Sequence, residues 1–109
     1  MDMVQEGLVE PEEIDVAIKT SLGIRLPIVG VMQTFDFQGL DMLLAYQQNV
    51  GKVYSFIEDR VKEGAVGAKA GKGIYDYQGR SEVEILKKRD ELYLKMLDYL
   101  HEIGAFEPL

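Results

Sequence analysis

Apolar residues in this chain recur at the three-to-four-residue spacing of an α-helix over most of its length. The alternation typical of a strand is possible only at Ile74-Tyr75-Asp76-Tyr77. We therefore expect an all-α bundle of about five or six helices. The expected helical segments are residues 1–7, 10–22 and 31–38, a segment from 41 to a break at 49–51, and residues 56–63 and 81–104.

Helix boundary signals support most of these segments. Pro11 suits the first position of a helix, and Ser81 with Glu84 forms a capping box at the start of the last one. Residues 24–30 contain Pro27 and Gly30 and are expected to be an apolar connector. The opening helix is short, and isolated short helices are marginal in water, so we expect the natural chain to continue upstream.

The spacing also predicts which apolar residues face inward. The residues expected to point into a core are Ile14, Ala17, Ile18 and Leu22, then Phe56, Ile57 and Val61, and finally Val83, Leu86, Tyr93, Leu97 and Leu100.

Glycines and lysines dominate residues 64–79, which are therefore expected to form a loop. Glycine-rich turns can cradle phosphate, but Gly67, Gly71 and Lys72 do not have the spacing of a Walker loop. The dinucleotide pattern fails as well, because Asp76 stands where a glycine is required. A structural loop that Tyr75 and Tyr77 anchor to the helices is the favoured interpretation.

Composition removes several classes of function. With no cysteine and one histidine, the chain has no thiolate catalysis, zinc-thiolate site or multi-histidine metal site. A net charge of −7 disfavours nucleic acid as a partner. The sequence shows neither a signal peptide nor an apolar run long enough to cross a membrane, so we expect a cytoplasmic protein with no membrane partner.

Candidate catalytic groups are also few. His101 is expected at the surface of the last helix, and Ser55 and Ser81 are better explained as helix caps than as nucleophiles. The acidic pair Glu12 and Glu13 fits the positive end of a helix better than acid–base work. The residues alone therefore indicate a helical, acidic domain without a catalytic group of its own.

Three pieces of sequence resemble one family in order. They are EGLVEPEEIDVA at residues 6–17, GIRLPIVGV followed by DFQGLD between residues 23 and 41, and EGAVGAKAGKGIYDY at residues 63–77. They are similar to motifs of the carboxy-terminal domain of 3-hydroxyacyl-CoA dehydrogenases. Val31 replaces the family's proline, Ile74 replaces a phenylalanine, and the segment between Asp41 and Ser55 is shorter, which leaves the acyl-chain preference open.

The resemblance implies a helical bundle like that of 3-hydroxyacyl-CoA and 6-phosphogluconate-type dehydrogenases. In such enzymes an amino-terminal Rossmann domain of the same chain binds NAD and supplies the catalytic histidine and glutamate. The helical domain covers the acyl-CoA substrate and commonly forms a homodimer. The resemblance implies that residues 1–80 form this domain, that the chain alone binds no cofactor and is inactive, and that residues 81–109 connect to a further module such as an enoyl-CoA hydratase.

No catalytic residue carries over from the family to this chain. Pro27, Gly30 and Asp36 are expected near the substrate cleft, because the connector at residues 24–30 faces the substrate in the family. The alternative is a self-contained helical module that forms homodimers and has no enzymatic role.

Overall fold

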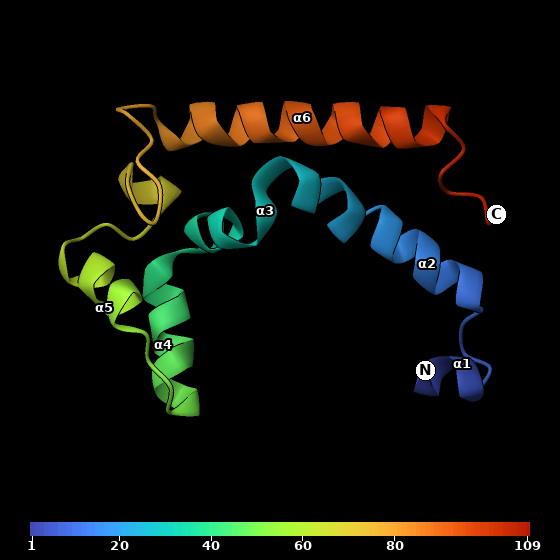
Figure 1. Cartoon of the computed structure of the whole chain (residues 1–109), viewed down its shortest axis with the longest axis horizontal. Coiled ribbons are helices and arrows are strands. Elements are labelled where there is room, and N and C mark those ends of the chain that lie inside the picture. Colours follow the sequence, from blue (N-terminus) through green and yellow to red (C-terminus); the bar gives the residue numbers. More distant parts are fainter. The chain divides into compact units, whose positions relative to one another are not determined.

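A computed structural model describes all 109 residues and contains six α-helices, one 3₁₀ turn and no named strand. The elements are α1 (Asp2–Gln5), α2 (Pro11–Lys19), α3 (Leu22–Gln38), α4 (Leu40–Val50), α5 (Ser55–Lys62), η1 (Ala68–Ala70) and α6 (Glu82–Glu102) (Figure 1). Isolated bridges join Gly67 to Lys72 and Lys72 to Asp76, and they do not extend into a sheet. The expectation of an all-α fold with five or six helices is confirmed.

The chain forms two compact units. The first unit consists of residues 1–28 and 90–109, and the second unit of residues 29–89. Thus α1, α2, the start of α3 and the later part of α6 belong to the first unit. The second unit holds the remainder of α3, then α4, α5, η1 and the start of α6. Within it α4 and α5 pack side by side (Figure 1).

In the first unit, α2 begins where the sequence predicts but ends early. The Glu13 carboxylate accepts a hydrogen bond from the Glu10 backbone N–H at 3.0 Å, which closes the first turn. The helix ends at Lys19, where the Ser21 N–H donates to the Ile18 carbonyl, and the Thr20 and Ser21 hydroxyls donate to the carbonyls of Val16 and Ala17. The predicted buried stripe is wrong. Its members Ile14, Ala17, Ile18 and Leu22 are all exposed, since no other element of the first unit covers them.

The expected connector at residues 24–30 is helical instead. Pro27 lies inside α3, beyond its first turn, and removes one helical hydrogen bond without ending the helix. The break comes at Gly30, whose φ of 67° and ψ of −173° interrupt the helix and separate residues 22–29 from residues 31–38. A backbone of this kind suits glycine, because a Cβ would make it strained.

In the second unit, the helix ends follow the predicted glycine signals. Gly51 ends α4 in the left-handed conformation at the break expected at residues 49–51, whereas α4 begins at Leu40, one residue earlier than expected. Ser55 is the first residue of α5 and makes no capping hydrogen bond, so its prediction as a helix cap is wrong. The buried hydrophobic residues of this unit are Leu40, Ile57, Ala65, Ala68, Tyr77 and Ile85. Two inward assignments are wrong: Phe56 is exposed beside the buried Ile57, and Val83 is exposed while Ile85 takes its place on the inner side of α6.

Candidate functional site

Asp36 is a buried carboxylate on the second half of α3. Its Oδ1 accepts a hydrogen bond from the Ile74 backbone N–H at 2.8 Å. Its Oδ2 accepts one from the Tyr75 N–H at 3.0 Å and one from the Tyr77 hydroxyl at 2.7 Å. A buried carboxylate is tolerated only when its oxygens are satisfied in this way. Asp36 therefore ties α3 to a loop about forty positions further along the chain.

Two glycines allow the loop to approach Asp36 closely. A Cβ on Gly67 would overlap the Asp36 carbonyl oxygen, and the φ of 125° at Gly67 is one that side chains rarely adopt. A Cβ on Gly73 would lie 2.5 Å from Asp36 Oδ1. The glycines at 67 and 73 are thus required by a close backbone approach, and this confirms the structural interpretation of the loop.

Tyr77 anchors the loop in the core of the second unit. Its ring packs with Ala68 and Ile85, and its centroid lies 6.5 Å from that of Phe37. Burial raises the pKa of Tyr77 far above its ordinary value, and the hydrogen bond to Asp36 raises it further. The hydroxyl therefore remains a donor to Asp36 throughout the physiological pH range. Tyr75, in contrast, anchors the loop through its backbone N–H, because its side chain is exposed.

The start of α4 meets the same loop. The N–H of the fully buried Leu40 donates to the Val66 carbonyl at 2.7 Å. Lys69 Nζ lies 2.9 Å from Oδ1 of Asp41 and donates to both carboxylate oxygens. This hydrogen bond lowers the pKa of Asp41. We call the contacts of residues 36–41 with residues 66–77 the loop clamp.

The three residues predicted to lie near a substrate cleft have different surroundings. Pro27 is exposed on α3 in the first unit, and Gly30 is half-buried at the break in that helix. Asp36 is buried, and hydrogen bonds of the loop clamp occupy both of its carboxylate oxygens. Their proximity to a substrate remains a prediction, because the cleft requires the other domain that the resemblance implies.

Sequence reasoning placed Asp36 and the glycine loop in separate motifs and missed that they touch. One signal points to the contact. Asp36 is the single charged residue in VMQTFDFQGL, which covers residues 31–40, and a lone carboxylate in an apolar helix needs donors from elsewhere. A loop with several glycines is a suitable source, because its backbone N–H groups are accessible.

The chemical groups available to the chain are limited. His101 is exposed, as predicted, and its ring lies 6.4 Å from that of Phe106. The structure contains no group of three or more histidine, cysteine, aspartate or glutamate side chains placed to hold a metal ion. None of the helices combines the length and the apolar character needed to cross a bilayer.

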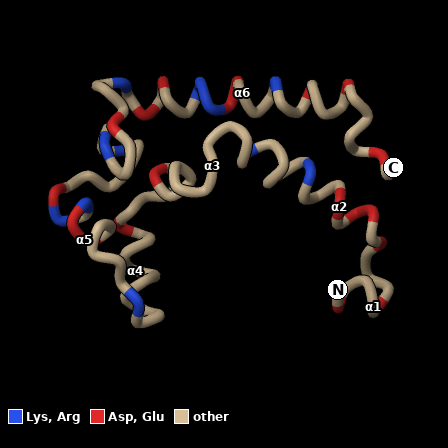
Figure 2. Tube along the Cα trace, in the orientation of Figure 1, with Lys and Arg blue, Asp and Glu red and all other residues tan.

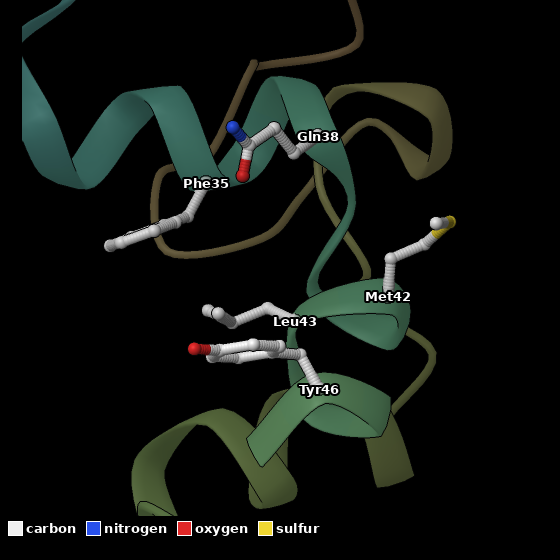
Figure 3. Close-up of a pocket in the computed structure, with 5 residues that line it drawn as sticks. All are labelled: Phe35, Gln38, Met42, Leu43 and Tyr46. Atoms are coloured by element: carbon white, nitrogen blue, oxygen red, sulfur yellow. The ribbon is translucent and has the colours of Figure 1, made fainter. Parts of the chain in front are cut away.

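A hollow of about 460 Å³ lies between the second half of α3 and α4. Its lining residues are Phe35, Gln38, Met42, Leu43 and Tyr46. Phe35, Leu43 and Tyr46 project to the same side, and no lining side chain is charged (Figure 3). A second hollow of about 310 Å³ shares Phe35 and Leu43 with the first and continues toward α5. Apolar hollows of this kind bind apolar groups rather than ions.

The chain matches a known family over residues 1–77. The matching family is described as 3-hydroxyacyl-CoA dehydrogenase, C-terminal domain. Its extent includes the loop clamp and the three motif pieces found in the sequence.

Two curated proteins are similar in sequence. A probable 3-hydroxybutyryl-CoA dehydrogenase from Bacillus subtilis is 34% identical over 86 residues, which are 72% of this chain and 29% of that protein. The 5-formyl-3-hydroxy-2-methylpyridine 4-carboxylate 5-dehydrogenase of Mesorhizobium japonicum is 26% identical over 84 residues, 71% of this chain and 27% of that protein. The chain thus matches less than a third of the length of either relative.

A solved structure extends the comparison. The 3-hydroxyacyl-CoA dehydrogenase of Archaeoglobus fulgidus matches 92% of this chain and 36% of its own chain, with a TM-score of 0.68 and 30% identity. Residues 1–80 are less than three quarters of the chain, so this match also includes part of residues 81–109.

Proposed function

Because the chain belongs to the family of 3-hydroxyacyl-CoA dehydrogenase C-terminal domains, we propose that it is the substrate-side and dimerisation domain of an NAD-dependent L-3-hydroxyacyl-CoA dehydrogenase. The parent enzyme oxidises a 3-hydroxyacyl-CoA to the 3-oxoacyl-CoA in fatty-acid metabolism. A Rossmann domain of the same protein binds NAD and removes the hydroxyl proton. The helical domain covers the acyl-CoA and joins two copies of the enzyme.

The loop clamp is the observation that supports assigning catalysis to the Rossmann domain and a covering role to the helical domain. The two carboxylates that make its contacts are both engaged, Asp36 by three donors and Asp41 by Lys69. A general base must face a substrate proton, whereas Asp36 is buried with both oxygens hydrogen-bonded and Asp41 is paired with Lys69. These contacts hold a scaffold together, and the proposal assigns proton and hydride transfer to the other domain.

The relatives support a dehydrogenase but name different substrates. One is a probable 3-hydroxybutyryl-CoA dehydrogenase and the other acts, by its name, on a pyridine carboxylate. An acyl-CoA is proposed here because the matching family and the solved neighbour both carry that activity in their descriptions. Relatives with different substrates share this kind of helical domain. We therefore favour a role of the domain in covering the substrate and assembling the enzyme over a role in selecting the substrate.

Exposed apolar residues in the first unit fit the proposal. Ile14, Ile18, Leu22 and Leu26 are large, exposed and close in sequence along α2 and the start of α3. An apolar surface of this kind commonly marks a contact with another domain. In the proposal, the Rossmann domain and the bound acyl-CoA cover it.

A chimera tests the proposal directly. The matched part of the Bacillus subtilis relative is replaced by this chain, and NADH oxidation with acetoacetyl-CoA is measured for the chimera, for the relative truncated before the matched part, and for this chain alone. We expect turnover in the chimera and none in the other two. A matched chimera with Asp36→Ala should lose activity, because the loop clamp no longer orders the helical domain.

The alternative is a helical module that forms homodimers and has no enzymatic role. It predicts a well-folded chimera that dimerises and does not oxidise NADH, and that result would refute the proposed function. Turnover by this chain alone would refute it as well, because the chain would then contain the catalytic groups.

A further inference from the structure

A hollow of about 320 Å³ lies in the first unit, between the start of α3 and the later part of α6. Residues 21, 24 and 25 recur at helical spacing, as do residues 93, 94 and 97, so one side of each helix forms a wall. We call this space the α3–α6 hollow, and its lining residues are Thr20, Ser21, Ile24, Arg25, Tyr93, Leu94 and Leu97.

The wall of the α3–α6 hollow is mainly apolar. Ile24 is the one buried hydrophobic residue of the first unit, and Tyr93 and Leu97 are half-buried. The hydroxyls of Thr20 and Ser21 donate to backbone carbonyls one turn earlier, so their hydrogens are already engaged. A concave wall of this kind covers an apolar chain or ring, and the few polar groups at its edge orient the ligand.

Arg25 is the charged residue of the lining, and it has no acidic partner. Its Nε donates to the Ser21 carbonyl at 3.4 Å, and Arg25 takes part in none of the ion pairs of the chain. The side chain is exposed, so a ligand can reach it. The two terminal nitrogens of a guanidinium can donate side by side to the two oxygens of one carboxylate.

The charge of the α3–α6 hollow differs from that of its surroundings. The chain has 19 acidic and 12 basic residues, yet no acidic residue lines this hollow. Another hollow of the first unit, of about 530 Å³, is lined by Glu10, Glu12 and Glu13. Acidic residues gather on α2, and charges of both signs alternate along α6 (Figure 2). An organic anion is therefore repelled from the glutamate-lined hollow and attracted to the one beside Arg25.

An apolar wall beside one guanidinium specifies the chemistry of the ligand. A phosphate on a polar nucleotide would leave the apolar wall uncovered, and a neutral apolar molecule would make no use of the guanidinium. We propose that the α3–α6 hollow binds a small organic carboxylate, with its apolar body against Ile24 and Leu97 and its carboxylate on Arg25. The site lies within the first unit and requires neither the loop clamp nor the Rossmann domain of the proposed function.

Three small molecules test the two parts of this site separately. Hexanoate, acetate and hexanamide are each titrated into the ¹⁵N-labelled 109-residue chain at neutral pH, and NMR shift changes give the dissociation constants. Acetate lacks the apolar body, and hexanamide has the body without the charge. We expect hexanoate to bind at least about fivefold more tightly than either, with shift changes at residues 20–25 and 93–97.

Variants of two arginines test the role of Arg25. Arg25→Gln should weaken hexanoate binding by about fivefold and leave hexanamide binding unchanged, because Arg25 is exposed and contributes a modest ion pair. Arg80→Gln is the matched control, since the Arg80 Nε also donates to a backbone carbonyl, at 3.0 Å, but Arg80 does not line the hollow. Arg25→Lys should restore only part of the affinity, because an ammonium keeps the charge and loses the paired donors. Circular dichroism should be the same for all three variants.

Several results would overturn the proposal. They are equal affinities for hexanoate and hexanamide, an Arg25→Gln variant that binds hexanoate as well as Arg80→Gln does, and shift changes that lie outside the α3–α6 hollow or are absent. Tighter binding of free coenzyme A than of hexanoate at the same residues would also overturn it, because the site would then recognise phosphate. The chimera assay contains no added carboxylate, so its outcome reports on the proposed function independently.

Discussion

The two compact units of the chain differ in how they hold their residues in place. The second unit contains six of the buried hydrophobic residues and the first unit only Ile24. In the second unit, hydrogen bonds join residues 36–41 to residues 66–77. In the first unit, the side-chain bonds of Thr20, Ser21 and Arg25 reach no further than four positions along the chain.

This contrast has a physical consequence. Local hydrogen bonds shape a helix but do not hold it against another element, and helical stability in proteins comes mostly from packing of an apolar face. The apolar face of α2 is exposed, so packing of that face adds little to the stability of the first unit. The second unit has its own core and its own long-range polar contacts, and it is the part that we expect to fold first and melt last.

Asp36→Ala should produce the largest effect, because it leaves the buried Tyr77 hydroxyl and two part-buried backbone N–H groups without their acceptor. We expect a loss of about 3–5 kcal/mol in the free energy of unfolding. Asp76→Ala is the control, since Asp76 is exposed and accepts a hydrogen bond only from the N–H of Gln78 two positions away. Urea unfolding followed by circular dichroism measures both. Equal urea midpoints for the two variants would show that the hydrogen bonds of Asp36 do not stabilise the fold.

Replacing one isoleucine by alanine in each unit compares the packing of the two units directly. Ile57 in the second unit is 1% exposed and Ile18 in the first unit is 51% exposed. Ile57→Ala should cost about 2–5 kcal/mol, because it opens a cavity in a packed core. Ile18→Ala should cost less than about 0.5 kcal/mol. Comparable losses, read from urea midpoints, would show that the first unit has a core of its own.

Gly67→Ala separates close approach from backbone strain. Gly51 also has a positive φ, but a Cβ there meets open space, whereas a Cβ on Gly67 overlaps the Asp36 carbonyl oxygen. We expect Gly67→Ala to lower the free energy of unfolding by about 2–3 kcal/mol and Gly51→Ala by about 1 kcal/mol. A thermal melt of each variant shows which loss is larger. A larger loss for Gly51→Ala than for Gly67→Ala would mean that the loop does not need to lie against α3.

Lys69→Met should give the smallest effect, because both partners of the Lys69–Asp41 pair are substantially exposed. The pKa of Asp41 is lowered in the folded chain by its hydrogen bond to Lys69. The stabilisation from this pair is therefore present at neutral pH and is lost as the pH falls through that lowered pKa. A carbon-detected NMR titration should show the pKa of Asp41 rise in Lys69→Met, and an unchanged value would contradict the pairing.

The sequence predicts where helices begin and end better than it predicts which of their residues are buried. Gly39, Gly51 and Ser81 act locally, through a positive φ or a hydroxyl that accepts the Glu84 N–H at 3.2 Å, so their effect can be read from the residues themselves. Burial depends on what lies opposite. The periodicity of α6 allows Val83 to face inward, but the loop clamp presents Tyr77 and Ala68 to Ile85 instead.

The loop clamp itself lies beyond what spacing can predict. Its partners are about forty positions apart, and no helical or strand period relates Asp36 to Ile74 or Tyr77. The family resemblance marks both segments without saying that they touch. Pro27 shows the opposite error. A local helix-breaking signal predicts a connector, yet Pro27 lies inside α3 and the helix is interrupted only at Gly30.

Native-state hydrogen exchange tests the contrast between the two units most directly. The amides of Ile74 and Tyr75 donate to a buried carboxylate, while those of Ile18 and Lys19 lie in a helix whose apolar side is exposed. We predict that the Ile74 and Tyr75 amides exchange only through global unfolding, with protection at least roughly a hundredfold greater than that of α2. Equal protection in α2 and in the loop would contradict the account.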